Sequence, residues 1–344
     1  MKKDKISLKD IANSLGVSTT LVSLVLNNKG EVHGISKETQ AKVIAKAKEL
    51  NYMPSFMARG LRTGRSFTIG VVVSDISNPF YSRMVRYMED EASKNGYTLL
   101  ISSSDESHNK ESKLIKMLID RQVDGLIISS SQPNLSFLSD VEASSIPYVL
   151  IDRVFEDNLN VNTISVDNIQ GSYKAVEHLV SQGYKKIAML AVTPIYVSTI
   201  RERIDGYLRS VDAFNLEYGS ELLVELDFYN LRQSILNIIN SMILKPEPEI
   251  DAIFAINNNV AVECLKSFKE LGIEVPQNLG FISFDDIDLY ELTSPSVSAI
   301  AQPLETLSTQ AVNMIIQNIE NKTHEFQQMK LDTELIIRES TLRE

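Results

Sequence analysis

Polar side chains follow several apolar runs in the second part of the chain, and their types suit the binding of a small polyhydroxylated ligand. Asp152 and Arg153 follow "YVLI", Asn257 follows "AIFAI", and Asp285 follows "FISF". Carboxylates and amides bind vicinal hydroxyls, arginine donates a planar fork, and an aromatic ring such as Phe80 can cover the apolar face of a sugar. If the runs are strands of parallel sheets, their carboxyl ends gather these groups at a ligand site.

A second set of chemically useful residues lies in "GVSTTLVSLVLNN", residues 16–28, where one face of a short helix carries mostly small polar groups. Small side chains let a helix sit deep in the DNA major groove, where hydroxyls pair with base edges and apolar groups touch the thymine methyl. We expect base contacts from Thr19, Thr20 and Leu24. We expect phosphate contacts from Ser18, Ser23 and Asn27. The alternative is an ordinary solvated helix face.

The pattern of residues does not indicate catalysis, a metal or a cofactor. Asp285 and Asp286 are adjacent, and neighbours at a strand end point in different directions, so they do not make an acid–base pair. His178 and His324 lie in helical, polar contexts, and the four histidines lack metal-ligand spacing. Neither a GxGxxG nor a Walker sequence follows a predicted strand. We therefore expect a binding protein without a cofactor, not an enzyme.

Charge divides the chain into a basic head and an acidic body. Residues 1–65 hold 12 Lys or Arg and 5 Asp or Glu, a net charge of +7, whereas the remainder carries −18. A basic segment on an acidic body suggests a nucleic-acid-binding module joined to something else. The start lacks a signal-peptide core, no run of about 18 apolar residues occurs, and Cys264 has no partner cysteine, so we expect a cytoplasmic protein without a membrane span.

The basic head reads as three short helices. Ser7, with Asp10 at the capping-box position, can start the first helix, and Gly16 can end it. Ser18 and Ser36 can cap the second and third. The apolar spacing predicts a core of Leu8, Ile11, Ala12, Leu15, Val17, Val22, Val25, Leu26, Val43, Ile44, Ala47 and Leu50. Two short helices joined by a glycine turn predict a helix-turn-helix.

The acidic body alternates short apolar runs with amphipathic stretches. "TIGVVVSD", "YTLLISSS" and "VDGLIISS" are separated by stretches such as "YSRMVRYMEDEASKNG", and the rhythm returns in "KKIAMLAV", "AIFAIN" and "GFISFDD". Such alternation is typical of βαβ units and parallel sheets. We therefore predict two doubly wound parallel-sheet subdomains behind an all-α head.

Several motifs resemble the LacI/GalR family of bacterial transcription regulators. They are "DIA", "GVS", "VSLVLN", "SKETQAKV", "LNYMP", "ARGLRTG" and "DISNPF", and the similarity continues to the C-terminus, where the body resembles periplasmic sugar-binding proteins. The resemblance implies a helix-turn-helix domain at 1–53 and a hinge at 54–66. It implies an N-terminal subdomain of 67–166 and 302–328, and a C-terminal subdomain of 167–301 and 329–344.

The resemblance also implies that the hinge helices of two subunits order together in the DNA minor groove. Leu61 matches the leucine that wedges into the central base step, and Arg59 is expected to contact the backbone. Gly60 departs from the family's usual Ser or Ala, and Gly costs roughly 0.5–1 kcal/mol in a helix relative to Ala. The hinge of this chain should therefore depend more on DNA and on dimerisation for its order.

By position, seven residues match ligand contacts of the family. These are Phe80, Asp152, Arg203, Phe228, Asn257, Asp285 and Gln302. Asn258 replaces the family's common Asp, which leaves the effector's identity open, and "IYVST" lacks an arginine that some relatives carry there. A sugar is therefore favoured over a purine-like corepressor.

The resulting hypothesis is a homodimeric repressor of carbohydrate-utilisation genes that leaves a pseudo-palindromic operator when a sugar-like effector binds. Two copies are expected because one small helix-turn-helix makes few contacts. The alternatives are a regulator that needs a purine-like corepressor or a protein partner, and a sugar-binding protein of transport or chemoreception. The last would need a signal peptide and no helix-turn-helix.

Overall fold

The computed structural model describes residues 6–52, 64–155, 160–216, 219–321 and 326–343. The chain divides into two compact units, 1–66 and 67–344, which we describe separately. Among the described residues, no helix combines the length and apolar character needed to cross a membrane.

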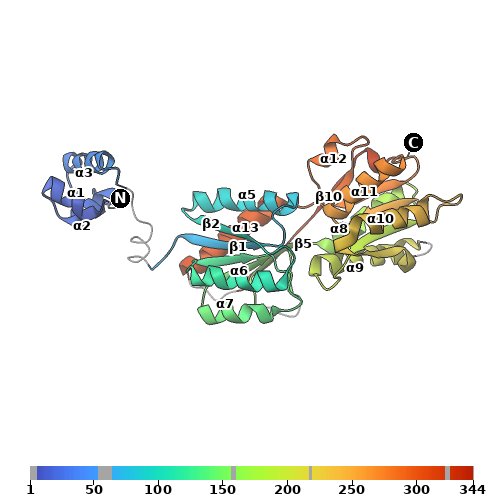
Figure 1. The fold of residues 1–344 in the computed structure, drawn as a ribbon, viewed down its shortest axis with the longest axis horizontal. Helices are drawn as coiled ribbons and strands as arrows, with labels where there is room; N and C mark the ends of the chain where they lie inside the picture. The colour runs from blue at the N-terminus through green and yellow to red at the C-terminus, as the bar shows by residue number, and fades with distance from the viewer. Residues whose placement is uncertain (1–5, 53–63, 156–159, 217–218, 322–325, 344) are drawn as a thin grey trace. The chain divides into compact units, whose positions relative to one another are not determined.

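The first unit is a bundle of α1 (Leu8–Leu15), α2 (Thr19–Leu26) and α3 (Lys37–Glu49), drawn in blue in Figure 1. The Asp10 carboxylate accepts hydrogen bonds from the Ser7 hydroxyl and backbone N–H at 2.7 and 2.8 Å, and Gly16 ends α1 at φ +64°. Ser18 and Ser36 accept backbone hydrogen bonds at the starts of α2 and α3. The predicted helix starts and the glycine stop are therefore confirmed.

The core of this unit is built around Ile11, Val22 and Val43, which are fully buried. The prediction for Ile44 is wrong, because its side chain is 53% exposed. One helical residue turns the side chain by about 100°, so when α3 directs Val43 and Ala47 to the core, Ile44 points outward.

The second unit contains, within the described residues, two six-stranded sheets. In spatial order the first sheet is β11 (Gln328–Leu331), β5 (Thr163–Val166), β4 (Tyr148–Ile151), β3 (Gly125–Ile128), β1 (Thr68–Val73) and β2 (Thr98–Ser103). The second is β12 (Glu334–Ile336), β10 (Ser298–Ala301), β9 (Gly280–Phe284), β8 (Ala252–Ala255), β6 (Ile187–Val192) and β7 (Leu223–Leu226). All pairings are parallel except β10 with β12, so the doubly wound fold is confirmed.

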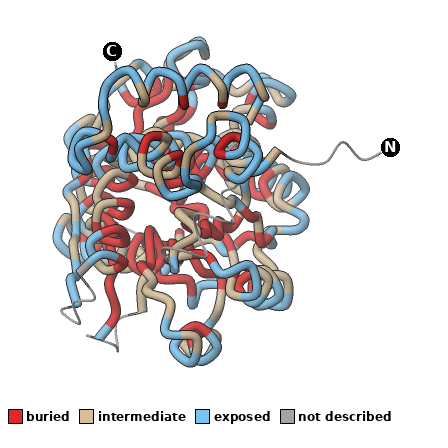
Figure 2. Tube along the Cα trace, turned by 90° about the vertical axis from the view of Figure 1, so that its left-hand side faces the viewer, coloured by how far each residue is buried: buried red, intermediate tan, exposed pale blue. Residues whose placement is uncertain are grey.

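Helices cover both faces of each sheet. Around the first sheet lie α5 (Pro79–Lys94), α6 (His108–Asp120), α7 (Ser139–Ser144) and α13 (Leu304–Asn321). Around the second lie α8 (Asn168–Ser181), α9 (Ser198–Phe214), α10 (Leu231–Ile238), α11 (Asn258–Leu271) and α12 (Leu289–Leu292). Figure 1 shows α6 and α7 on the opposite side of the first sheet from α5. Because both faces of each sheet are covered, the sequences of the central strands are continuous apolar runs. Figure 2 shows the buried residues, in red, toward the inside of the molecule.

The chain crosses between the sheets three times, after β5, β10 and β11. The third crossing corrects the predicted subdomain boundary at 328, because Gln328–Leu331 belongs to the first sheet, paired in parallel with β5. Met329 and Leu331 pack on that sheet's core, which holds the strand there, and the chain passes to the second sheet only at residues 332–333.

Candidate functional site

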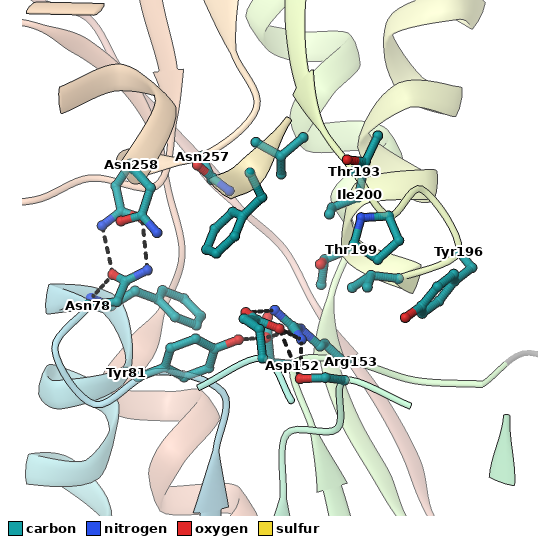
Figure 3. A pocket seen from close by; sticks show the side chains of 18 of the residues that line it. Asn78, Tyr81, Asp152, Arg153, Thr193, Tyr196, Thr199, Ile200, Asn257 and Asn258 are labelled. Carbon is teal, nitrogen blue, oxygen red and sulfur yellow. Dashed lines mark hydrogen bonds and ion pairs between the residues drawn. The ribbon is translucent and has the colours of Figure 1, made fainter. Parts of the chain in front are cut away.

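A cavity of about 420 Å³ lies between the two sheets, at the carboxyl ends of their strands. Figure 3 shows Asp152 and Arg153 on one side of it and Asn257 on the other. Six of the seven predicted ligand contacts line it, namely Phe80, Asp152, Arg203, Phe228, Asn257 and Asp285. Gln302 lies behind this lining and donates a hydrogen bond from Nε2 to Asp285 Oδ1 at 2.6 Å. The folding of the chain therefore brings the seven positions together.

Asp285 follows β9 with its backbone in the left-handed region, at φ +70°. Its side chain is buried, and Oδ1 lies 3.7 Å from Arg203 Nη2 in an ion pair. The neighbouring Asp286 points away and makes two hydrogen bonds with Arg338, at 2.8 and 2.9 Å. The two adjacent carboxylates thus point in different directions, as expected, and of the two only Asp285 lines the cavity.

Arg203, on α9, is held from three sides. Nε donates to Asn168 Oδ1 and Nη1 donates to the Ile256 carbonyl, both at 2.9 Å. The guanidinium carbon lies 3.7 Å from the centroid of the Phe284 ring. These contacts fix the position of the guanidinium, and its remaining edge faces Asp285 and the cavity. Because the side chain is already ordered, ligand binding costs little further side-chain entropy.

Asp152 occupies the corresponding place at the end of β4, at φ +67°. Oδ2 accepts hydrogen bonds from the Tyr81 hydroxyl at 3.0 Å and from Ser129 Oγ at 3.3 Å. Burial raises the pKa of Asp152, and the nearby guanidinium groups of Arg153 and Arg203 oppose that rise. This carboxylate is therefore a buried acceptor that pairs with hydroxyl donors.

An arginine–glutamate pair completes the wall beside Asp152, and the sequence-based set of contacts omits it. Arg153 Nη1 and Nη2 donate to the two oxygens of Glu106 at 2.7 and 2.6 Å, and Nη1 also donates to Ser131 Oγ at 3.0 Å. Burial alone would raise the pKa of Glu106, but the Arg153 guanidinium outweighs it and holds that pKa below its ordinary value. The position of Arg153 after "YVLI" signals its role; nothing around Glu106 does.

Among the described residues, several contacts between side chains link the two halves of the cavity. The amides of Asn78 and Asn258 exchange hydrogen bonds at 2.7 and 3.3 Å, as Figure 3 shows. The Tyr196 hydroxyl lies 2.7 Å from His108 Nε2. Arg83 on α5 pairs with Asp288 on the loop after β9. Asn258, the departure from the family pattern, therefore forms a bridge in a closed cleft.

Asn257 and the two phenylalanines have structural contacts as well as places in the lining. Asn257 caps α11, because its side chain accepts a hydrogen bond from the Val260 N–H at 3.0 Å. The rings of Phe80 and Tyr81 meet edge-on with centroids 4.9 Å apart. Phe228 begins a turn after β7 and packs on the second core.

On the first unit, the face of α2 predicted to meet DNA is open. Ser18, Thr19, Thr20 and Asn27 are exposed, and Ser23 and Leu24 are half-buried. Two of the predicted phosphate contacts also stabilise the helix: the Ser18 hydroxyl accepts from the Leu21 N–H at 3.2 Å, and the Asn27 amide donates to the Ser23 carbonyl at 2.6 Å. The remaining two predictions, Arg59 and Leu61, lie outside the described residues.

Two family descriptions match the chain along nearly its whole length. Residues 7–55 match "Bacterial regulatory proteins, lacI family", and residues 66–339 match "Periplasmic binding proteins and sugar binding domain of LacI family". Both parts of the matched pattern correspond to units seen in the structure, the helical head and the two-sheet body.

Individual relatives agree with these matches. The chain is 33% identical to the "Ribose operon repressor" of Halalkalibacterium halodurans, with 97% of each chain covered, and 31% identical to the "HTH-type transcriptional repressor PurR" of Photobacterium profundum, with 97% of this chain and 98% of the relative covered. A solved LacI-type regulator from Alkaliphilus metalliredigens, in complex with D-xylulofuranose, superposes with a TM-score of 0.68 at 28% identity over 80% of this chain and 99% of that one. The chain belongs to the LacI family, and it is a DNA-binding transcriptional regulator, not an enzyme.

Proposed function

We propose that this regulator represses carbohydrate-utilisation genes and leaves its operator when a sugar-like effector enters the cavity between the two sheets. The observation that carries the proposal is the composition of that cavity. Asp152 and Asp285 accept hydrogen bonds from hydroxyls, Arg203 donates, and Phe80 and Phe228 supply apolar rings for a sugar face. The names of the ribose repressor and of the D-xylulofuranose complex support the same ligand class.

On the DNA side, we propose a homodimer that binds a pseudo-palindromic operator in the cytoplasm. Each α2 enters a major groove, where Thr19, Thr20 and Leu24 contact bases. Ser18, Ser23, Asn27 and Arg59 contact the backbone, and Leu61 of each hinge wedges into the minor groove. Two-fold symmetry doubles the contacts that one small head can make.

The effector acts by shifting a population between two states of the body. It can do so only through a difference in affinity for the DNA-competent and the incompetent state. A sugar that binds the closed form of the cleft more tightly than an open form holds the body closed and so sets the spacing of the hinges in the dimer, and the hinges then lose their minor-groove contacts.

The proposal is tested by first selecting a preferred duplex from random DNA with the full-length protein. Neutral sugars are then added one at a time while operator binding is followed by fluorescence anisotropy at fixed salt, because phosphate contacts make affinity strongly salt-dependent. We expect one sugar to weaken operator binding by about tenfold or more. No preference for any duplex over random competitor would contradict the proposal.

A second candidate is a regulator that binds DNA only with a purine-like corepressor. The similarity to a PurR repressor favours it. Against it, residues 196–199 lack the arginine that some relatives carry there. The same titration with hypoxanthine and guanine separates the two, since a corepressor strengthens operator binding and an inducer weakens it.

A further inference from the structure

Arg153 and Glu106 form an ion pair at the wall of the cavity, so the two side chains together carry no net charge. Both terminal nitrogens of Arg153 are committed to Glu106, in the two-bond geometry that is the strongest for this pair. The side chains are 11% and 24% exposed, so water screens the pair weakly. The Nε atom lies 3.9 Å from Asp152 Oδ2 and makes no hydrogen bond to any described residue. Arg153 thus remains a cation, but the Glu106 carboxylate balances its charge and occupies both of its terminal nitrogens.

The cavity as a whole has an excess of negative charge. Its charged lining residues are Glu106, Asp152, Asp285, Arg153 and Arg203. Arg203 faces Asp285 at 3.7 Å, so each guanidinium already has a carboxylate partner and one carboxylate remains in excess. A ligand carboxylate or phosphate would add a further buried negative charge, and no unpaired cation among the described lining residues could receive it, which is costly. An uncharged polyol instead adds no charge and donates hydrogen bonds to the aspartates.

We infer that Glu106 selects the charge class of the effector: by balancing the charge of Arg153, it makes the cavity accept uncharged sugars and reject sugar acids and sugar phosphates. This inference rests on the proposed function and deepens it. Glu106 acts through Arg153, so it is a residue that determines specificity without needing to touch the ligand.

The loop after β2 directs Glu106 inward and its neighbour outward. Asp105 and Glu106 both adopt positive φ, +51° and +55°. Asp105 turns to solvent, where it pairs with Lys110 and accepts a hydrogen bond from Ser103 Oγ at 2.7 Å. Asp105→Asn therefore removes the same unit of charge from the same loop without altering Arg153, and it is a matched control for Glu106→Gln.

The test is isothermal titration of the full-length protein and its variants with three matched pairs of ligands. The pairs are D-glucose with D-glucuronate, D-galactose with D-galacturonate, and D-ribose with D-riburonate, so that both members of each pair keep the sugar ring. For the pair that contains the preferred sugar, we expect the wild type to bind the neutral member at least about tenfold more tightly. Glu106→Gln should reduce that ratio by about tenfold or more, chiefly through tighter binding of the acid. Glu106→Asp, which keeps the charge, and Asp105→Asn should retain the wild-type ratio.

The ratio is a readout that a merely structural role for Glu106 would not move, since loosening the wall weakens both members of a pair. The inference is overturned if the wild type binds the acid as tightly as the neutral sugar, or if Glu106→Gln leaves the ratio unchanged. If Glu106→Gln alone does not fold, Glu106→Gln with Arg153→Gln removes both charges and should keep the neutral preference; an acid preference in that double variant overturns the inference too. If no sugar or sugar acid binds the protein or changes its affinity for the operator, the proposed function itself is contradicted. That outcome can be distinguished from the results above, which concern only the role of Glu106.

Discussion

At the scale of single residues, two aspartates occupy equivalent places in the two sheets. Asp152 follows β4 and Asp285 follows β9, which hold the same position in their strand orders. Both residues have positive φ, which is uncommon for a side chain other than Gly and is enriched for Asp and Asn. That backbone conformation costs free energy, and it leaves both carboxylates at the cavity wall, facing the ligand space from opposite sides.

Replacing Arg203 by alanine should abolish the effector response and leave operator binding intact. The variant loses a charged donor and leaves Asp285 buried without its cation, so we expect effector affinity to fall about 10- to 100-fold. Titration calorimetry measures the affinity, and anisotropy measures operator binding. Arg201→Ala, on the exposed side of the same helix, should retain the response. A normal response in Arg203→Ala would show that the ligand binds elsewhere.

Effector affinity should fall with decreasing pH, and the drop should begin at a higher pH than an exposed aspartate would give. Burial raises the pKa of Asp152, against the opposing effect of Arg153 and Arg203 and with the support of Asp285. The ionised form accepts hydroxyl donors; protonation through the raised pKa removes an acceptor, so binding weakens. Calorimetry from about pH 8 to about pH 5 follows this loss. In Asp152→Asn the affinity should be weaker at neutral pH and less dependent on pH over that range.

At the scale of elements, the approach of α8 to α9 positions Arg203 and Asn168. Gly206 allows it, since a Cβ on this residue would lie 2.2 Å from the Ile169 carbonyl oxygen. The two helices carry the two ends of the Arg203–Asn168 hydrogen bond, so their spacing sets the geometry of the cavity wall.

Gly206→Ala should therefore destabilise the body. Helix propensity alone predicts that Ala is more stable than Gly by about 1 kcal/mol, whereas forcing the helices apart costs about 1–3 kcal/mol, so the two effects differ in sign. We expect a lower midpoint in urea unfolding and weaker effector binding, because Arg203 moves with α9. A raised midpoint would mean that the helices separate without cost.

The second element with a consequence for function is α2, whose exposed face carries Thr20. If Thr20 reads a base edge, Thr20→Ala should change which duplexes are selected from random DNA, and not only lower affinity for all of them. Thr39→Ala, at the start of α3, is the comparison for general effects on the head. An unaltered selected sequence would argue against direct readout by Thr20.

At the scale of the whole molecule, the body is closed around its cavity by contacts between residues far apart in the chain. The Asn78–Asn258 amide pair is the most specific of them, because each amide both donates and accepts. A carboxylate at position 258 could only accept hydrogen bonds and could not donate one to Asn78. The asparagine found here therefore holds the cleft closed through two hydrogen bonds between uncharged groups.

Asn258→Ala should open the cleft and weaken effector binding. Part of the binding free energy of the ligand must then be used to close the cleft. Small-angle X-ray scattering of the isolated 67–344 unit measures the change as a larger radius of gyration without ligand, and saturating ligand should reverse it. Asn259→Ala, the next residue on α11, should leave the unliganded dimensions unchanged. Identical scattering from Asn258→Ala and wild type would assign closure to the other bridges.

Much of the organisation could be predicted because its signals are local. The caps at Ser7, Ser18 and Ser36 and the stop at Gly16 depend on a few neighbouring residues, and they are correct. The alternation that predicts two parallel sheets is also local, since burial on both faces makes each strand apolar. The errors arise where long-range packing decides: Ile44 is turned out of its predicted core, and β11 joins the first sheet.

The sequence by itself determined the charged halves, the helix-turn-helix, the alternating fold and the polar residues at strand ends, because these follow from backbone geometry and from the period of apolar side chains. Only the tertiary structure decided which polar groups meet. Glu106 reaches Arg153 across 47 positions, and Asn78 reaches Asn258 across 180. Those meetings depend on loops from different strands converging, and convergence is set by the packing of two cores that no local signal describes. The balance of charge in the cavity depends on those contacts, and so does the charge class that we infer for the effector.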